Sequence, residues 1–112
     1  MSIEAEMLKL PKLKHVGLAL VEFVYSLEKG SFVERTTDWI YEPSKSVAFG
    51  FPSRGPEQIR LQFRQPYPRY LTERDMKQLE PGRFNHFKFR IKSPAQLADA
   101  ARYTELGILH HC

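Results

Sequence analysis

Apolar residues near the start of the chain recur at intervals of three and four positions, which is the spacing of one face of an amphipathic helix. This stripe consists of Leu13, Val16, Leu20, Val24 and Leu27. Pro11 suits the first turn and Gly30 the end, so a long helix is predicted over residues 11–29. The apolar arc is widened by Val21, Phe23 and Tyr25. The helix is therefore expected to pack on a sheet and to touch a second element or subunit.

From Phe32 onwards the apolar residues tend to alternate with polar ones, which is the period of a β-strand. Four segments are predicted to be strands: RTTDWIYEP (35–43), KSVAFGF (45–51), EQIRLQFR (57–64) and HFKFRIK (86–92). The first three are joined by short Pro/Gly/Ser connections. An antiparallel meander is predicted, because parallel strands need a crossover of about a dozen residues.

Two further helices are indicated by capping signatures. Thr72, with Asp75 three positions later, predicts a short helix over residues 72–79. The sequence SPAQ (93–96) supplies an N-cap, a proline at the first helical position and a capping-box amide. The helix that follows is predicted to continue to Gly107.

Together these elements predict one α+β domain over residues 1–112. The expected architecture is a two-layer sandwich, with an antiparallel sheet of about four strands and two main helices on one face. The predicted core contains Leu20, Val24, Trp39, Phe49, Leu61, Phe63, Phe87, Phe89 and Ile91.

Basic residues alternate with apolar ones in both IRLQFR and HFKFRIK, so the basic side chains are expected to leave a shared sheet on its outer face. The predicted nucleic-acid-binding residues are Arg60, Arg64, His86, Lys88, Arg90 and Lys92. The alternative interpretation is a solvated face whose charges keep the protein soluble and discourage edge pairing.

The distribution of charge agrees with either interpretation. Residues 54–92 carry 10 Lys/Arg and 4 Asp/Glu, a net +6. Residues 1–53 carry 6 Lys/Arg and 7 Asp/Glu, and residues 93–112 carry 1 Lys/Arg and 2 Asp/Glu. Each of these two segments has a net charge of −1, so the net charge of the chain is +4. Such asymmetry suggests an anionic partner.

Nearby aromatic residues that could stack on bases are Tyr67, Tyr70 and Phe84. The aromatic residues of the basic strands themselves point to the core, so a duplex or a protein partner suits the pattern equally well.

The sequence has no Gly-rich phosphate loop, serine elbow or cysteine nucleophile motif. Asp38, Glu42 and Lys45 resemble the carboxylate and lysine set of metal-dependent nucleases, but the spacing and the intervening Pro43 break that pattern. The potential metal ligands His110, His111 and Cys112 are adjacent and are expected to form a frayed tail. No catalytic residue, metal site or cofactor is predicted.

The acidic start of the sequence, the lack of an apolar run of about 18 residues and the single cysteine predict a cytoplasmic protein without a membrane partner.

The chain resembles a small bacterial domain family sometimes labelled a predicted transport protein domain. The resemblance covers residues 10–106 and is carried by DWIYEPSKSVAF, IRLQF and PGRFNHFKFRIKSPAQLADA. It implies an α+β domain found alone or appended to larger proteins, including restriction and defence systems, and it implies no catalytic residues. The ending TELGILHHC departs from the acidic and aromatic ending usual in that family.

Three functional classes follow. The favoured hypothesis is a non-catalytic binding or accessory module that takes DNA or RNA on its basic face. The alternative is a protein-interaction or homodimerisation module, suggested by the wide apolar arc of the first helix and by the loop RQPYPRYL. An enzyme is the third class, without a motif to support it.

Overall fold

A computed structural model describes residues 2–112. Its sheet has six antiparallel strands in the order β1-β2-β3-β4-β6-β5. The strands are β1 (Ser31–Glu34), β2 (Asp38–Glu42), β3 (Val47–Gly50), β4 (Ile59–Arg64), β5 (Glu80–Pro81) and β6 (His86–Ile91). The predicted α+β class with an antiparallel sheet is confirmed, whereas the predicted number of about four strands was too low.

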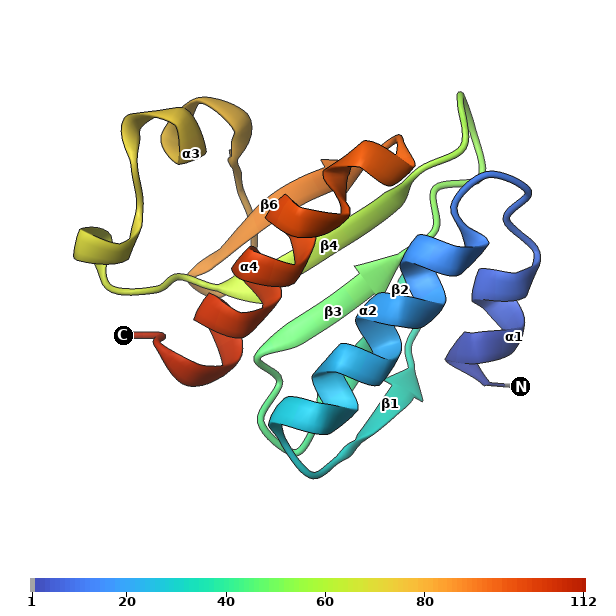
Figure 1. Ribbon diagram of the computed structural model, residues 1–112. Helices are drawn as coiled ribbons and strands as arrows, with labels where there is room; N and C mark the ends of the chain where they lie inside the picture. Colours follow the sequence, from blue (N-terminus) through green and yellow to red (C-terminus); the bar gives the residue numbers. More distant parts are fainter. Residues whose placement is uncertain (1) are drawn as a thin grey trace.

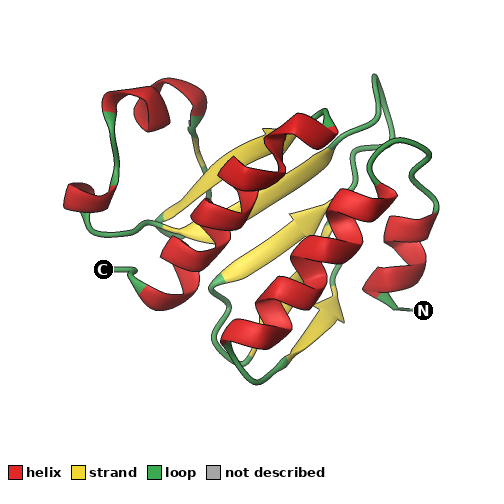
Figure 2. Ribbon diagram, in the orientation of Figure 1, coloured by secondary structure: helices red, strands yellow, loops and turns green. Residues whose placement is uncertain are grey.

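The helices are α1 (Ile3–Leu8), α2 (Lys14–Leu27), α3 (Glu73–Gln78) and α4 (Leu97–Leu109), with 3₁₀ turns at η1 (Pro68–Tyr70) and η2 (Pro94–Gln96). Helices α2 and α4 lie across the same face of the sheet (Figure 1). The strands are visible behind these two helices in Figure 2, and α3 stands to one side. One face of the sheet is therefore covered by helices.

The two unpredicted strands lie at the edges of the sheet. In β1, the ring of Phe32 packs 4.9 Å from that of Tyr41 and 5.5 Å from that of Phe49, measured between centroids. Strand β1 thus depends on contacts with residues distant in sequence. Strand β5 has only two residues, one of them a proline, so it is too short to produce an alternating pattern.

Helix α1 was also not predicted, and it packs on α2. A Cβ atom added to Gly17 of α2 would lie 2.2 Å from Sδ of Met7, so the glycine allows the two helices to approach closely. Tyr25 of α2 donates a hydrogen bond to Glu4 of α1 at 3.4 Å, and its ring packs on Phe32. Of the residues that widen the apolar arc of α2, Val21 is thus buried within the chain and Tyr25 makes the contacts above while staying 42% exposed, and the homodimer stays a prediction.

The capping signatures are confirmed, but two helix ends differ from prediction. Capping boxes are present at Thr72, before α3, and at Ser93, before η2. Helix α2 is shorter than residues 11–29, and α4 continues through Gly107 instead of ending there. A Cβ at Gly107 would lie 2.8 Å from Cβ of Phe63, so this glycine permits close packing of α4 on β4.

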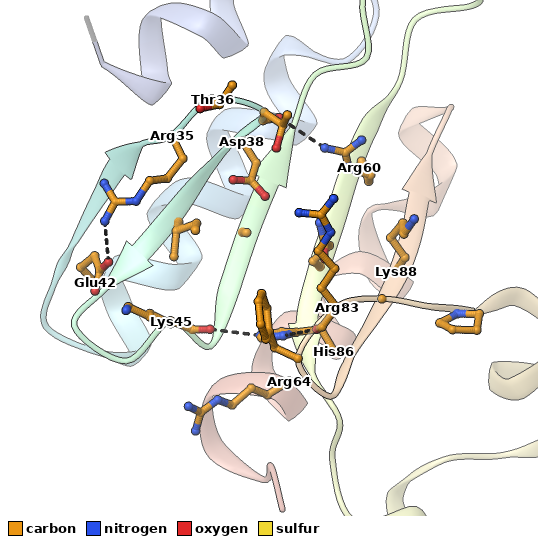
Figure 3. A pocket seen from close by; sticks show the side chains of 17 residues that line it. Arg35, Thr36, Asp38, Glu42, Lys45, Arg60, Arg64, Arg83, His86 and Lys88 are labelled. Atoms are coloured by element: carbon orange, nitrogen blue, oxygen red, sulfur yellow. Dashed lines mark hydrogen bonds and ion pairs between the residues drawn. The ribbon is translucent and has the colours of Figure 1, made fainter.

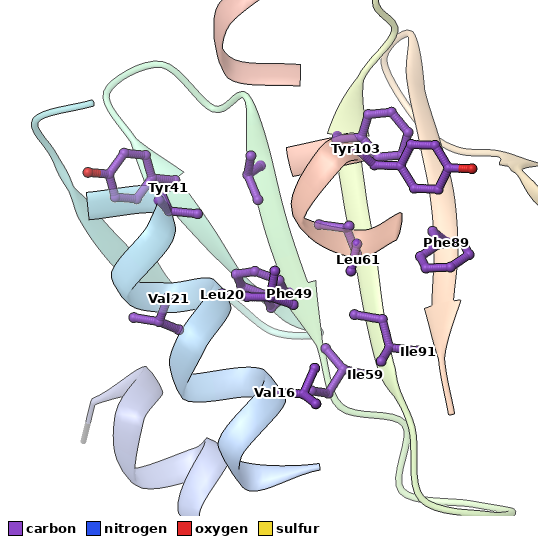
Figure 4. Packing of buried hydrophobic residues seen from close by; sticks show 14 of the residues in the cluster. Val16, Leu20, Val21, Tyr41, Phe49, Ile59, Leu61, Phe89, Ile91 and Tyr103 are labelled. Atoms are coloured by element: carbon purple, nitrogen blue, oxygen red, sulfur yellow. The ribbon is translucent and has the colours of Figure 1, made fainter. Parts of the chain in front are cut away.

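The core lies between the helices and the sheet (Figure 4). Leu61 of β4 pairs with Phe89 of β6, and both side chains are buried. Tyr103 of α4 stacks on Phe63 at 5.2 Å and meets Phe89 edge to face at 5.0 Å. Eight of the nine predicted core residues are buried, and Phe87 is partly buried against them.

We expect Phe89→Ala to lower the unfolding free energy by about 3–5 kcal/mol, because it leaves a cavity beneath α4. The matched control is Phe84→Ala, since the Phe84 side chain is 88% exposed. This control should change the unfolding free energy by only about 0.5 kcal/mol. Urea denaturation of both variants measures the difference, and similar losses in the two would contradict this description of the core.

Candidate functional site

The sheet face opposite the helices carries most of the predicted basic residues. The pairing of β4 with β6 sets Arg60 opposite Arg90, and Arg64 opposite His86. Lys88 lies between them, opposite Gln62. Because side chains two positions apart share a face, these residues project from the side of the sheet that α2 and α4 leave uncovered.

A groove of about 840 Å³ runs over this uncovered face, and we call it the basic groove. Its cationic lining residues are Arg35, Lys45, Arg60, Arg64, Arg83 and Lys88. Its acidic lining residues are Asp38 and Glu42. Six Lys/Arg against two carboxylates leave a net charge of +4, with basic side chains distributed along the groove from Arg60 to Arg64 (Figure 3).

Most of these cations have no carboxylate partner. Arg35 forms an ion pair with Glu42, with 3.1 Å between Nη2 and Oε2. Among residues 2–112, no ion pair is formed by Lys45, Arg64, Arg83 or Lys88. The groove therefore presents positive charge that the described part of the chain does not neutralise.

Arg60 is held against the floor of the groove. A Cβ atom at Gly50 would lie 2.5 Å from Nη2 of Arg60, so the guanidinium packs over the bare glycine backbone. The same Nη2 donates a hydrogen bond of 3.3 Å to the carbonyl oxygen of Thr37. The buried Nε has no acceptor within the described residues, which is unusual for a buried donor.

His86 connects two turns that border the groove. Its Nδ1 lies 2.9 Å from the carbonyl oxygen of Arg83, and its Nε2 lies 3.1 Å from that of Lys45. Lys45 lies in the turn between β2 and β3, and Arg83 in the turn between β5 and β6. A neutral imidazole has one N–H and can donate it to one of these two carbonyl oxygens, so the ring lies between the backbones of the two turns and is hydrogen-bonded to one of them.

Two of the six predicted binding residues do not line the groove. Arg90 projects from the same face, but its Nε pairs with Glu80 at 2.9 Å and its Nη1 donates to Gln58 at 3.3 Å. Lys92 follows the end of β6, and its backbone N–H donates to Gln96 at the start of the next helical segment. The groove is instead lined by four of the six: Arg60, Arg64, His86 and Lys88.

Three groove cations were missed as binding residues: Arg35, Lys45 and Arg83. All three lie outside the strands, in the connections that flank β2 and precede β6, so alternation could not identify them. Their positions beside turn residues, as in the sequence PGRFN, were the available signal.

The two carboxylates of the groove stand at opposite ends of β2. Asp38 and Glu42 are the first and last residues of β2, so about 13 Å of extended backbone separates them. Within residues 2–112, no group of three or more potential metal ligands is found.

The predicted frayed tail was wrong. The backbone N–H of Cys112 donates to the carbonyl oxygen of Gln65 at 3.1 Å. The backbone N–H of Tyr67 donates to the carbonyl oxygen of His110, also at 3.1 Å. The ring of His110 also packs 4.7 Å from that of Tyr70. Backbone pairing with residues 65–67 thus orders the tail.

A second polar cluster joins α3 to α4. The Asp75 side chain is 1% exposed and accepts two hydrogen bonds from Arg102, at 2.8 and 2.6 Å, and one from the hydroxyl of Tyr103 at 2.7 Å. The hydrogen bonds from Arg102 hold the pKa of Asp75 well below its usual range. Burial raises the pKa of Tyr103 to about 12. With Asp75 kept ionised and Tyr103 kept neutral, the cluster is suited to holding α3 in place.

No protein-family model matches the sequence, and no significant match was found among curated proteins or solved structures. The resemblance to the bacterial domain family therefore stays a prediction. None of the helices in residues 2–112 is long and apolar enough to span a membrane.

We expect Asp75→Asn to lower the unfolding free energy at pH 7 by about 2–4 kcal/mol. This is somewhat less than the roughly 3–5 kcal/mol for a fully buried pair, because the Arg102 side chain is 38% exposed. The lowered pKa of Asp75 means that its contribution to stability is fully present above the unfolded-state pKa of about 3.9 and declines as the pH falls from there through the lower folded-state pKa. Urea denaturation between pH 7 and pH 2.5 should show the difference between the two proteins narrowing in acid. A constant difference would contradict this role.

Proposed function

We propose that this domain is a non-catalytic module that binds the phosphate backbone of a nucleic acid in the basic groove. The observation that carries the proposal is the set of unpaired groove cations: Lys45, Arg64, Arg83 and Lys88. Lys and Arg side chains bind nucleic acids by neutralising phosphates and releasing the counterions condensed on them.

The arrangement of charge favours a polyanion over simple solvation. Arg60 lies directly opposite Arg90 in the sheet, and like charges at such positions destabilise the pairing. Glu80 offsets the charge of Arg90, but the neighbouring Arg64 and Lys88 have no such partner among the described residues. A bound phosphate backbone would relieve this repulsion.

The shape of the site also suits a chain-like ligand. The groove is open and extends over β2, β3, β4 and the hairpin of β5 and β6. Its cations come from both the strands and the bordering turns, so a backbone lying in it meets positive charge along its length. Contacts of this kind position a nucleic acid without reading its sequence.

The proposal predicts that binding depends on groove cations and not on net charge alone. The test variant is R64Q/R83Q/K88Q, and the matched control is K12Q/K29Q/K77Q, which removes the same three charges from exposed positions outside the groove. Fluorescence anisotropy with a labelled 12-mer of deoxythymidine and a 12-base-pair duplex measures affinity between 50 and 200 mM salt.

The unmodified protein should bind with an affinity that falls steeply with salt. The groove variant should weaken binding and flatten the log–log slope by about 2–3, because each lost phosphate contact removes a little under one. The control should keep a slope close to that of the unmodified protein. Equal effects of the two triple variants, or no salt-dependent binding by the unmodified protein, would overturn the proposal.

A further inference from the structure

The most exposed large hydrophobic side chain of the described residues stands at the basic groove. Phe84 lines the groove, although its side chain is almost fully exposed to solvent. It also lines a second, smaller hollow of about 370 Å³, which it shares with Arg64, Asn85 and Cys112. The ring therefore forms a ridge between two hollows, with Arg64 beside both.

The backbone at Phe84 is sterically unfavourable. Phe84 and Asn85 have φ angles of 53° and 60°, in the left-handed region, and the N–H of His86 donates to the carbonyl oxygen of Arg83 at 3.0 Å. These features define a type I′ turn, whose central positions favour Asn and Gly because a Cβ atom is crowded there. Neither local conformation nor burial accounts for a phenylalanine at this position.

The turn that carries Phe84 is fixed by several hydrogen bonds. Gly82 N–H donates to the carbonyl oxygen of His86 at 2.8 Å, and Gln65 N–H donates to that of Asn85 at 2.9 Å. Nε2 of the His86 ring also lies 3.1 Å from the carbonyl oxygen of Lys45, in the turn between β2 and β3. An aromatic ring held on such a turn can meet a flat ligand with little loss of conformational freedom.

We propose that Phe84 is a base-stacking side chain that makes the basic groove select unpaired single strands over duplexes. This inference rests on the proposed function, since the groove cations supply the phosphate contacts. Aromatic rings beside a basic groove stack on exposed bases regardless of their sequence. In a duplex the bases are already stacked on one another, so the ring gains nothing from them.

The position of Phe84 also limits what the site can read. None of the strand residues that line the groove is a phenylalanine, tyrosine or tryptophan. Stacking is therefore confined to the rim, at Phe84, and the remaining contacts are made with the backbone. We expect one base to be held by stacking, with little preference for its identity.

The test compares F84A, F84L and F84W with the unmodified protein, using the same labelled deoxythymidine 12-mer and 12-base-pair duplex. Loss of one stacked base should weaken single-strand binding by about tenfold in F84A and F84L. Duplex affinity and the salt slope should stay unchanged, because no phosphate contact is removed. F84W should keep a single-strand affinity close to that of the unmodified protein, because an indole ring also stacks on bases. The fluorescence of the added indole should be quenched by the single strand and not by the duplex.

The matched control is Tyr67→Ala, which removes a partly exposed aromatic ring outside the groove and should leave both affinities unchanged. Equal weakening of single-strand and duplex binding by F84A, or full single-strand affinity in F84L, would overturn the role of Phe84. If R64Q/R83Q/K88Q weakens binding while F84A does not, only the stacking inference falls. If the unmodified protein binds neither probe, the proposed function falls with it.

Discussion

In the described residues 2–112, helices cover one face of the sheet and leave the other open, and the remaining features of the molecule depend on this one-sided packing. In β4 and β6, every second residue is apolar and faces the helices; all of these are buried except the partly buried Phe87, as in the pair of Leu61 and Phe89. A slip of one residue would bury arginine and lysine side chains and expose phenylalanines, so the core holds the register strongly. The basic groove therefore exists because the opposite face is packed.

The basic groove is formed by residues of the strands together with residues of the turns that border them. The sheet alone supplies the charge of Arg60, Arg64 and Lys88, whereas the connections supply further cations and the exposed aromatic ring. His86 joins these two contributions, because it lies in β6 and its ring contacts the backbone of two turns. A rigid sheet with functional side chains on bordering turns is a common arrangement in binding domains.

The sequence was most informative where local pattern and burial coincide. Alternation identified β4 and β6 and four of the residues that line the groove, and capping residues identified the starts of α3 and η2. It was least informative where a contact joins distant residues. The pairing of Arg90 with Glu80 withdraws a predicted cation from the groove, and the contact of Gly107 with Phe63 turns an expected helix end into a packing site.

The cations in turns are a second case in which the sequence could not show which residues come together. Arg35, Lys45 and Arg83 belong to no periodic pattern, and only the folded sheet brings them to one groove. Helix α1 and strand β1 were missed for a related reason, since each is short and is stabilised by packing against α2 or β2. Local propensity is weak in such short segments, and tertiary contacts decide their structure.

The uncovered sheet face is the proposed binding surface, and an NMR titration tests this most directly. Backbone amide spectra of the labelled protein would be recorded while a deoxythymidine 12-mer is added. Shifts should concentrate in β2, β3, β4, β6 and the turns at Lys45 and Phe84, with the exposed sides of α2 and α4 unchanged. Shifts centred on α2 and α4, with the groove unaffected, would contradict it.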